Sequence, residues 1–167
     1  MKKLFILILL FVNTLIANET KIELTTTYDE FQDVTWIEPN FDNYEGYPII
    51  YAYIGHQNEE YWLRLVAQYK SSDWIFFEQL ILLHNGIRKV IKFNYSQKTS
   101  KVVSGGIYEA IDIQVDADLL EYLEDYSLST NSKLRFYGDK YYADRDIGEF
   151  ELQALQVVIN KYKELKK

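Results

Sequence analysis

The chain of 167 residues contains no cysteine, two histidines and one methionine. The lack of cysteine excludes disulfide bonds, thiol nucleophiles and thiolate metal sites. A single methionine excludes the Met-rich, adaptable surface of a promiscuous binding protein. Neither histidine has a partner at the spacing of a known metal motif. His56 with Glu59 and Glu60 could form a mixed site, but a solvated hairpin turn explains these residues better. We therefore predict no metal and no cofactor.

Clusters of Lys and Arg are also lacking before the C-terminus. The formal net charge is −7, with 18 basic and 25 acidic residues. Binding to a phosphate backbone requires a basic stripe, and attachment to an anionic lipid surface requires a basic patch. We therefore expect no nucleic-acid partner and no anionic membrane surface as partner.

The first residues have the layout of a secretory signal peptide. Lys2 and Lys3 precede the apolar stretch Leu4–Val12, and Ala17 offers a small residue for cleavage. An uncleaved membrane anchor is the alternative, but the apolar stretch is shorter than the roughly 20 residues that span a bilayer. We predict a signal peptide over residues 1–17 and a single globular α+β domain over 18–167, periplasmic or secreted, with no membrane span. This leader holds two lysines and no acid, so the mature chain would carry −9.

Most of the remaining chain has the pattern of β-strands. Aromatic residues make up 16% of the sequence, and they pack well on a pleated surface. In "YWLRLVAQY" (61–69), Leu63, Leu65 and Ala67 share one face, while Trp62 and Arg64 share the other. Similar runs predict about seven to nine antiparallel strands; they lie near residues 21–27, 34–38, 49–55, 61–69, 73–84, 87–95, 102–115 and 133–142.

Two helices are predicted in the C-terminal half. Asp116 is a candidate N-cap for a helix that extends to about residue 128. The second, from about 147 to 166, has an apolar stripe and a capping-box spacing between Asp146 and Glu149. The predicted fold class is therefore α+β: a curved or sandwich-like antiparallel β-sheet with two C-terminal-half helices packed against it.

The stretch "DWIFFEQLILLHNG" (73–86) places an acid inside an apolar run. Its Asn-Gly end predicts a tight hairpin, with His84 opposite Ile87 at an exposed strand end. If "KSSD" forms a four-residue turn, Leu80 lies opposite Leu63 and the even-numbered face, including Glu78, is the core face. Three explanations of Glu78 follow, in order of preference: a β-bulge that turns it outward, a buried pair with Arg135 or a tyrosine hydroxyl, or a functional acid in a cleft.

Two surfaces are candidate binding sites. The odd-numbered face of the same stretch would place Phe77 and Ile81 beside Trp62, giving a mixed apolar and basic face suited to docking. The segment "RFYGDKYY" offers a second site, because Arg135 with the tyrosines could clasp a carboxylate or stack on a sugar. The predicted site residues are Trp62, Phe77, Ile81, Arg135, Tyr137 and Tyr141, with no catalytic residue among them.

No nucleophile elbow, P-loop, dinucleotide fingerprint or calcium loop occurs in the sequence. We therefore expect an exported bacterial protein that is a non-catalytic binding module for an envelope protein or a small ligand. Two alternatives stay open: a small envelope hydrolase that uses an acid such as Glu78, and a structural envelope protein, a homo-oligomer joined through the mixed face.

Overall fold

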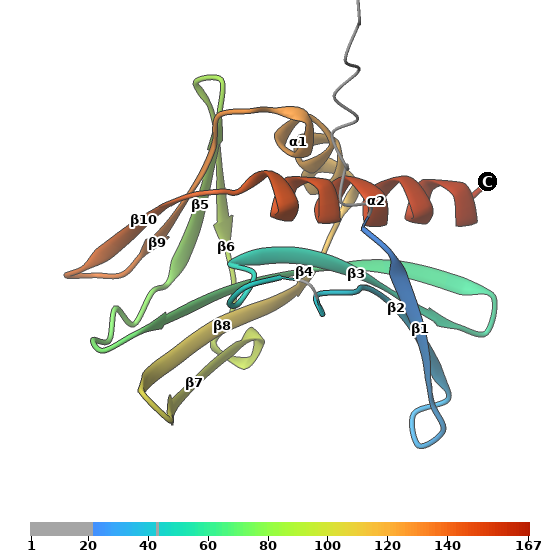
Figure 1. Ribbon diagram of the computed structural model, residues 1–167, viewed down its shortest axis with the longest axis horizontal. Helices are drawn as coiled ribbons and strands as arrows, with labels where there is room; N and C mark the ends of the chain where they lie inside the picture. Colours follow the sequence, from blue (N-terminus) through green and yellow to red (C-terminus); the bar gives the residue numbers. More distant parts are fainter. Residues whose placement is uncertain (1–21, 43) are drawn as a thin grey trace, which may run out of the picture.

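The computed structural model describes residues 22–42 and 44–167, and these form two antiparallel β-sheets and two helices (Figure 1). The predicted α+β class is confirmed, with ten strands in the described residues. The six-stranded sheet has the order β1-β2-β3-β4-β8-β7 and the four-stranded sheet the order β10-β9-β5-β6. The strands are β1 (Leu24–Asp29), β2 (Val34–Pro39), β3 (Ile50–Gln57), β4 (Glu60–Ser71), β5 (Gln79–His84), β6 (Ile87–Lys92), β7 (Lys98–Val103), β8 (Gly106–Gln114), β9 (Ser132–Tyr137) and β10 (Tyr142–Asp146).

The helices complete the core between the sheets. Helix α2 (Glu149–Leu165) lies along the inner face of the six-stranded sheet, and α1 (Ala117–Leu128) packs against α2 (Figure 1). Period-two alternation in the strands supplies the core: Leu63, Leu65 and Ala67 of β4 are fully buried, as their spacing predicted. No helix in the described part of the chain is long and apolar enough to cross a membrane. The predicted signal peptide lies outside the described residues.

The helix starts are only partly as predicted. Asp116 caps α1, where its Oδ1 accepts a hydrogen bond of 2.8 Å from the backbone N–H of Leu119. The cap predicted at Asp146 is wrong, because Gly148 is the N-cap of α2 and Glu151 is the acid that reaches back to it. The second oxygen of the buried Glu151 carboxylate accepts from the N–H of Ile49, so this residue ties α2 to the segment before β3.

The predicted hairpin between β4 and β5 does not form. Strand β4 pairs with β3 and β8, whereas β5 pairs with β6 and β9, so the chain crosses from one sheet to the other over residues 72–78. The pairing of Leu63 with Leu80 was therefore wrong. Phe76 has a left-handed backbone, with φ of 52°, and its exposed ring stacks on Trp74. Burial alternates through this segment, so that Ile75 and Phe77 are buried and Glu78 is exposed, and the alternation changes phase between Phe77 and Leu80.

A buried ion pair fastens this crossing segment. Glu109 of β8 is fully buried, and its Oε2 accepts hydrogen bonds of 3.0 Å from the N–H groups of both Ile75 and Phe76. Its Oε1 lies 2.7 Å from Nζ of Lys98, which also donates to the carbonyl oxygen of Phe77. The carboxylate that is buried against the crossing segment is therefore that of Glu109 and not that of Glu78.

The hairpin of β5 and β6 has the predicted register. Asn85 and Gly86 both have positive φ, and His84 pairs with Ile87 across the turn. The expected exposure of His84 is wrong: only 3% of this residue is exposed. Its ring meets Tyr122 and Tyr126 of α1 edge to face, because that helix covers the inner side of the strand end.

Candidate functional site

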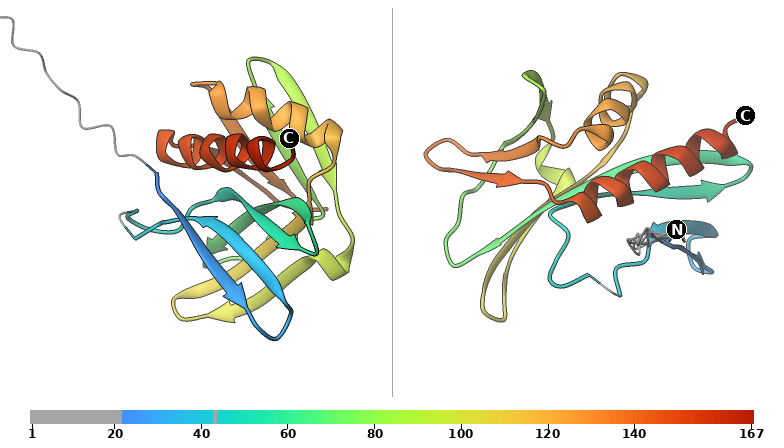
Figure 2. Two further views of the ribbon diagram at one scale, coloured as in Figure 1. Left: turned by 90° about the vertical axis from the view of Figure 1, so that its right-hand side faces the viewer. Right: turned by 45° about the horizontal axis from the view of Figure 1, so that its top comes forward.

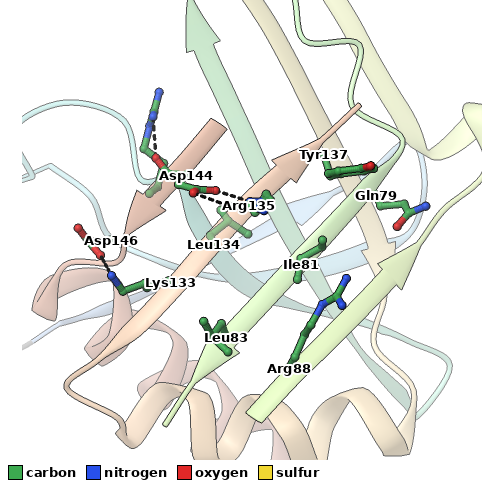
Figure 3. A pocket seen from close by; sticks show the side chains of 11 residues that line it. Gln79, Ile81, Leu83, Arg88, Lys133, Leu134, Arg135, Tyr137, Asp144 and Asp146 are labelled. Atoms are coloured by element: carbon green, nitrogen blue, oxygen red, sulfur yellow. Dashed lines mark hydrogen bonds and ion pairs between the residues drawn. The ribbon is translucent and has the colours of Figure 1, made fainter. Parts of the chain in front are cut away.

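The outer face of the four-stranded sheet, which points away from the helices, carries a groove of about 700 Å³, hereafter the outer groove (Figure 3). Its lining comes from all four strands of that sheet. The lining residues are Gln79, Ile81, Leu83, Arg88, Lys133, Leu134, Arg135, Tyr137, Asp144, Arg145 and Asp146.

The strand registers explain how the lining is assembled. Ile81 of β5 pairs with Arg135 on one side and with Val90 on the other. Leu83 pairs with Lys133 on one side and with Arg88 on the other. Each row therefore places a half-buried aliphatic side chain at the centre; the Leu83 row has a cation on both flanks, and the Ile81 row has one cation, Arg135. The expected mixed face exists here, although β9 and not β4 supplies its second flank.

The two acids of the groove are already neutralised. The guanidinium of Arg135 binds Asp144 through two hydrogen bonds of 2.6 and 2.7 Å, and Lys133 lies 3.2 Å from Asp146. The hydrogen bonds from Arg135 hold the pKa of Asp144 below its usual range, so this carboxyl is ionised at neutral pH.

Arg88 differs from Arg135 and Lys133 of the groove because no acid among the described residues pairs with it. It is exposed, its side chain extends beside Ile81 (Figure 3), and it forms no ion pair within the part of the chain that the structure describes. Lys92, four residues further along β6, is exposed and also forms no ion pair within the described residues. The lining holds four cationic and two anionic side chains, so its net charge is +2 in a chain whose net charge is −7.

The predicted Arg-Tyr cluster is partly within the groove. Arg135 and Tyr137 line it, while Tyr142 lies under Arg135, with the guanidinium carbon 4.3 Å from the ring centre. Tyr141 is exposed on the β9–β10 turn and does not line the groove. The cluster lies at the hairpin end of β9 and β10, where Tyr137, Tyr141 and Tyr142 are exposed.

The predicted grouping of Trp62, Phe77 and Ile81 is wrong. Trp62 lies on β4 of the six-stranded sheet, and only Ile81 lines the groove. Phe77 is fully buried and packs edge to face on Phe93 and Phe136, so a substitution there would test folding rather than binding. The buried positions change from odd to even numbers between Phe77 and Leu80, so Phe77 and Ile81 lie on opposite faces of the chain.

Glu78 is the candidate acid of the hydrolase hypothesis. It is exposed, its N–H donates to the carbonyl of Tyr137, and its side chain is not part of the groove lining as described. The first explanation was a β-bulge that turns this side chain outward. The side chain is exposed, and the buried face of the chain changes between Phe77 and Leu80. The proposed pair with Arg135 is wrong, because Arg135 binds Asp144.

Trp62 instead belongs to an aromatic cluster on the outer face of the six-stranded sheet. Its ring lies against Gly55, where an added Cβ would come within 2.2 Å of the indole. Trp36 meets Trp62 and Tyr53 edge to face, at centroid distances of 6.0 and 5.5 Å. These contacts cover the sheet face with side chains that pack on one another.

A polar network adjoins this aromatic cluster. One carboxylate oxygen of Asp112 accepts from Arg64 and the other from the hydroxyl of Tyr53, at 2.8 and 2.7 Å. Burial, followed by the hydrogen bond to Asp112, raises the pKa of Tyr53. Burial raises the pKa of the neighbouring Tyr51 to about 12. Both carboxylate oxygens of Asp112 therefore have a hydrogen-bond donor within the protein.

Sequence reasoning missed several lining residues, although a signal for some of them was present. Lys133, Arg135 and Tyr137 alternate with the buried Leu134 and Phe136, which is the pattern of a strand with one solvent face. Asp144 and Asp146 alternate in the same way on β10. The sequence did not show that β9 pairs with β5, and that pairing creates the groove.

The described residues contain no group of His, Cys, Asp and Glu arranged to hold a metal ion. The outer groove offers cationic, aromatic and aliphatic contacts, which suit binding by charge and apolar surface.

When the chain was compared with protein-family models, with curated proteins and with solved structures, no match was found in any of the three.

Proposed function

We propose that this protein is an exported, non-catalytic binding module and that the outer groove is its ligand-binding surface. The observation that carries the proposal is the unpaired Arg88 beside the half-buried Ile81 and Leu83, in a groove whose two acids, Asp144 and Asp146, are already paired. A cation that is paired within the protein attracts an external group less strongly than an unpaired one does. An unpaired cation next to exposed apolar surface therefore supports an external partner.

The ligand chemistry follows from the layout of the face. The aliphatic strip along β5 would accept apolar side chains, and Arg88 and Lys92 would accept carboxylates along one side of it. A segment in which acids alternate with apolar residues presents both, because alternate side chains of an extended chain point to opposite faces. We therefore assign an acidic, extended peptide segment of an envelope protein as the ligand class.

Fluorescence anisotropy with two labelled peptides tests this assignment. A peptide of alternating Glu and Leu should bind the mature protein, and one of alternating Lys and Leu should not. Arg88→Glu should weaken binding of the Glu-Leu peptide by about tenfold or more, because it replaces attraction by repulsion.

Lys101→Glu provides the matched control. It makes the same type of charge reversal at an exposed position on β7, in the other sheet, and should change binding by less than about twofold. Equal losses in both variants, or equal binding of both peptides, would assign any binding to general charge and overturn the proposal. If the Glu-Leu peptide does not bind, the proposal is overturned as well.

Export is tested separately. When the full chain is expressed in a Gram-negative host, the periplasmic fraction should contain a protein whose mass lacks residues 1–17. Recovery of only the full-length chain in the cytoplasm would contradict the export part of the proposal, while the peptide experiments would still stand.

A further inference from the structure

The tip of the β1–β2 hairpin is exposed in a way that the fold does not explain. Phe31 is 94% exposed, and it lies among three acids, Asp29, Glu30 and Asp33. A large aromatic side chain in water loses the hydrophobic stabilisation that burial would provide. The tip therefore combines an apolar anchor with a net charge of −3.

This tip is held in one conformation. Oδ1 of Asp29 accepts hydrogen bonds from the N–H groups of Phe31 and Gln32, at 2.9 and 3.1 Å. The hydroxyl of Tyr28 donates to Asp33 at 2.8 Å, and the side chain of Gln57 on β3 donates to the carbonyl of Gln32. A segment ordered in advance loses little conformational entropy on binding, which favours its use as a docking element.

The chemistry of the tip complements that of the outer groove. The tip presents an aromatic ring flanked by carboxylates, and the groove presents Ile81 and Leu83 flanked by the unpaired Arg88. A net charge of −3 would meet a lining of net charge +2. Anchor residues of this kind, an aromatic ring set into a pocket with charges at its rim, supply most of the affinity in protein interfaces.

The two surfaces lie at opposite ends of the molecule. Figure 1 shows the β1–β2 hairpin at one end and the hairpin of β9 and β10, one wall of the groove, at the other. The right-hand view of Figure 2 shows the same separation. A tip that docks in a groove must therefore belong to another molecule, which would make the contact head-to-tail. Such a contact leaves one tip and one groove free at the ends of each assembly, so chains can extend.

We propose that the groove binds the β1–β2 tip of a second copy of this protein, with Phe31 as the anchor and Arg88 as the principal cation. This inference rests on the proposed function, because it names the occupant of the same groove. It assigns the acidic segment to the protein itself and predicts self-association of the mature chain.

Sedimentation velocity over about 1 to 300 µM tests this inference, a range that suits weak interfaces. The wild-type chain should form concentration-dependent species larger than a dimer. Phe31→Asp removes the anchor and Arg88→Glu reverses the cation, and both positions are exposed, so neither change should affect folding. Each variant alone should be monomeric, with association weakened about tenfold or more.

Mixing the two variants is the decisive arm of the experiment. The Phe31→Asp protein has an intact groove and the Arg88→Glu protein has an intact tip, so the mixture should form a 1:1 dimer and no larger species. The control Lys101→Glu should associate like the wild type. Association of Phe31→Asp at the wild-type level, or failure of the mixture to dimerise, would overturn the inference.

The outcome also separates this inference from the proposed function. If the wild-type chain stays monomeric while the Glu-Leu peptide binds in an Arg88-dependent way, the groove is a binding site for another protein and the second-copy inference is wrong. If the chain self-associates through Phe31 but Arg88→Glu has no effect, the tip docks elsewhere and the groove assignment is wrong.

Discussion

The outer faces of the two sheets each carry an Arg–Asp pair, but the surroundings of the two pairs differ. Arg64 and Asp112 have side chains that are 28% and 45% exposed, whereas those of Arg135 and Asp144 are 41% and 56% exposed. On the six-stranded sheet, Tyr53 donates a further hydrogen bond to Asp112. On the four-stranded sheet, the pair borders a groove that also contains an unpaired cation.

The comparison teaches how a completed surface differs from one that is available for a partner. In the six-stranded sheet, Trp36 and Trp62 pack on each other and the carboxylate of Asp112 has both oxygens occupied. In the four-stranded sheet, Ile81 is half-buried beside the groove and Arg88 is unpaired among the described residues. The Arg64–Asp112 pair of the first face has its partners within the protein, whereas the second face also carries Arg88, which has none among the described residues.

The largest expected effect comes from breaking the link between the sheets. Glu109→Ala would leave Lys98, whose side chain is only 8% exposed, without its counter-charge, and the N–H groups of Ile75 and Phe76 without an acceptor. Breaking a buried pair from one side costs about 3–5 kcal/mol. Urea denaturation followed by circular dichroism should show a loss of stability of about this size.

Glu78→Ala is the matched control, because it removes an acid from the same crossing segment. Glu78 is exposed, so the free energy of unfolding should change by less than about 0.5 kcal/mol. Similar losses for the two variants would contradict the assignment of Glu109 as the acid that fastens the sheets.

The next effect concerns the six-stranded face. Asp112→Asn keeps the shape of the side chain but removes the charge that pairs with Arg64, and it should lower the free energy of unfolding by about 1–2 kcal/mol, since the pair is partly exposed. The same change should lower the pKa of Tyr53, because Asp112 stabilises the protonated hydroxyl by hydrogen bond and charge.

A carbon-13 NMR titration of labelled tyrosine measures this second effect. The folded-state pKa of Tyr53 is raised, so the native protein retains this proton above pH 10, the ordinary tyrosine pKa, and the associated stability is lost as the pH rises further. An unchanged Tyr53 titration in Asp112→Asn would mean that burial alone raises the pKa.

Much of the fold was predictable because it depends on local pattern. Alternation identified the buried face of β4, the Asn-Gly pair identified the β5–β6 hairpin, and Asp116 marked the start of α1. The crossing from β4 to β5 was not predictable in this way. "KSSD" has the composition of a tight turn, and what directs the chain to the other sheet is Glu109, which lies far along the sequence.

The candidate site was predicted only in fragments for the same reason. Ile81 and Arg135 were assigned to separate surfaces, and the pairing of β5 with β9 makes them neighbours. Glu109 itself had a readable signal, since it alternates with Ile107 and Ile111 on the core face of its strand. His84 was misplaced because its burial depends on α1, whose position no local pattern reveals.

Of the three ion pairs, the one between Arg135 and Asp144 should contribute least to stability, and its removal best distinguishes the outer faces of the two sheets. Asp144→Asn breaks the exposed pair with Arg135 and should cost less than about 1 kcal/mol at pH 7. The pKa of Asp144 is lowered in the folded state, so its contribution is present above the ordinary carboxyl pKa and is lost as the pH falls through the lowered value. The stabilities of the wild type and the variant should therefore converge at pH values below the lowered pKa. Thermal unfolding at a series of pH values measures this convergence.

Asp144→Asn should lower stability but raise the affinity of the groove for the Glu-Leu peptide. It frees the guanidinium of Arg135 beside Ile81, so the anisotropy titration should show tighter binding of the Glu-Leu peptide, by about twofold to tenfold. Asp112→Asn, which frees a guanidinium on the other sheet, should leave that binding unchanged. If both variants increased binding equally, net charge rather than the position of the cation would control it. A gain confined to Asp144→Asn would identify the four-stranded face as the one that has unpaired groups for a partner.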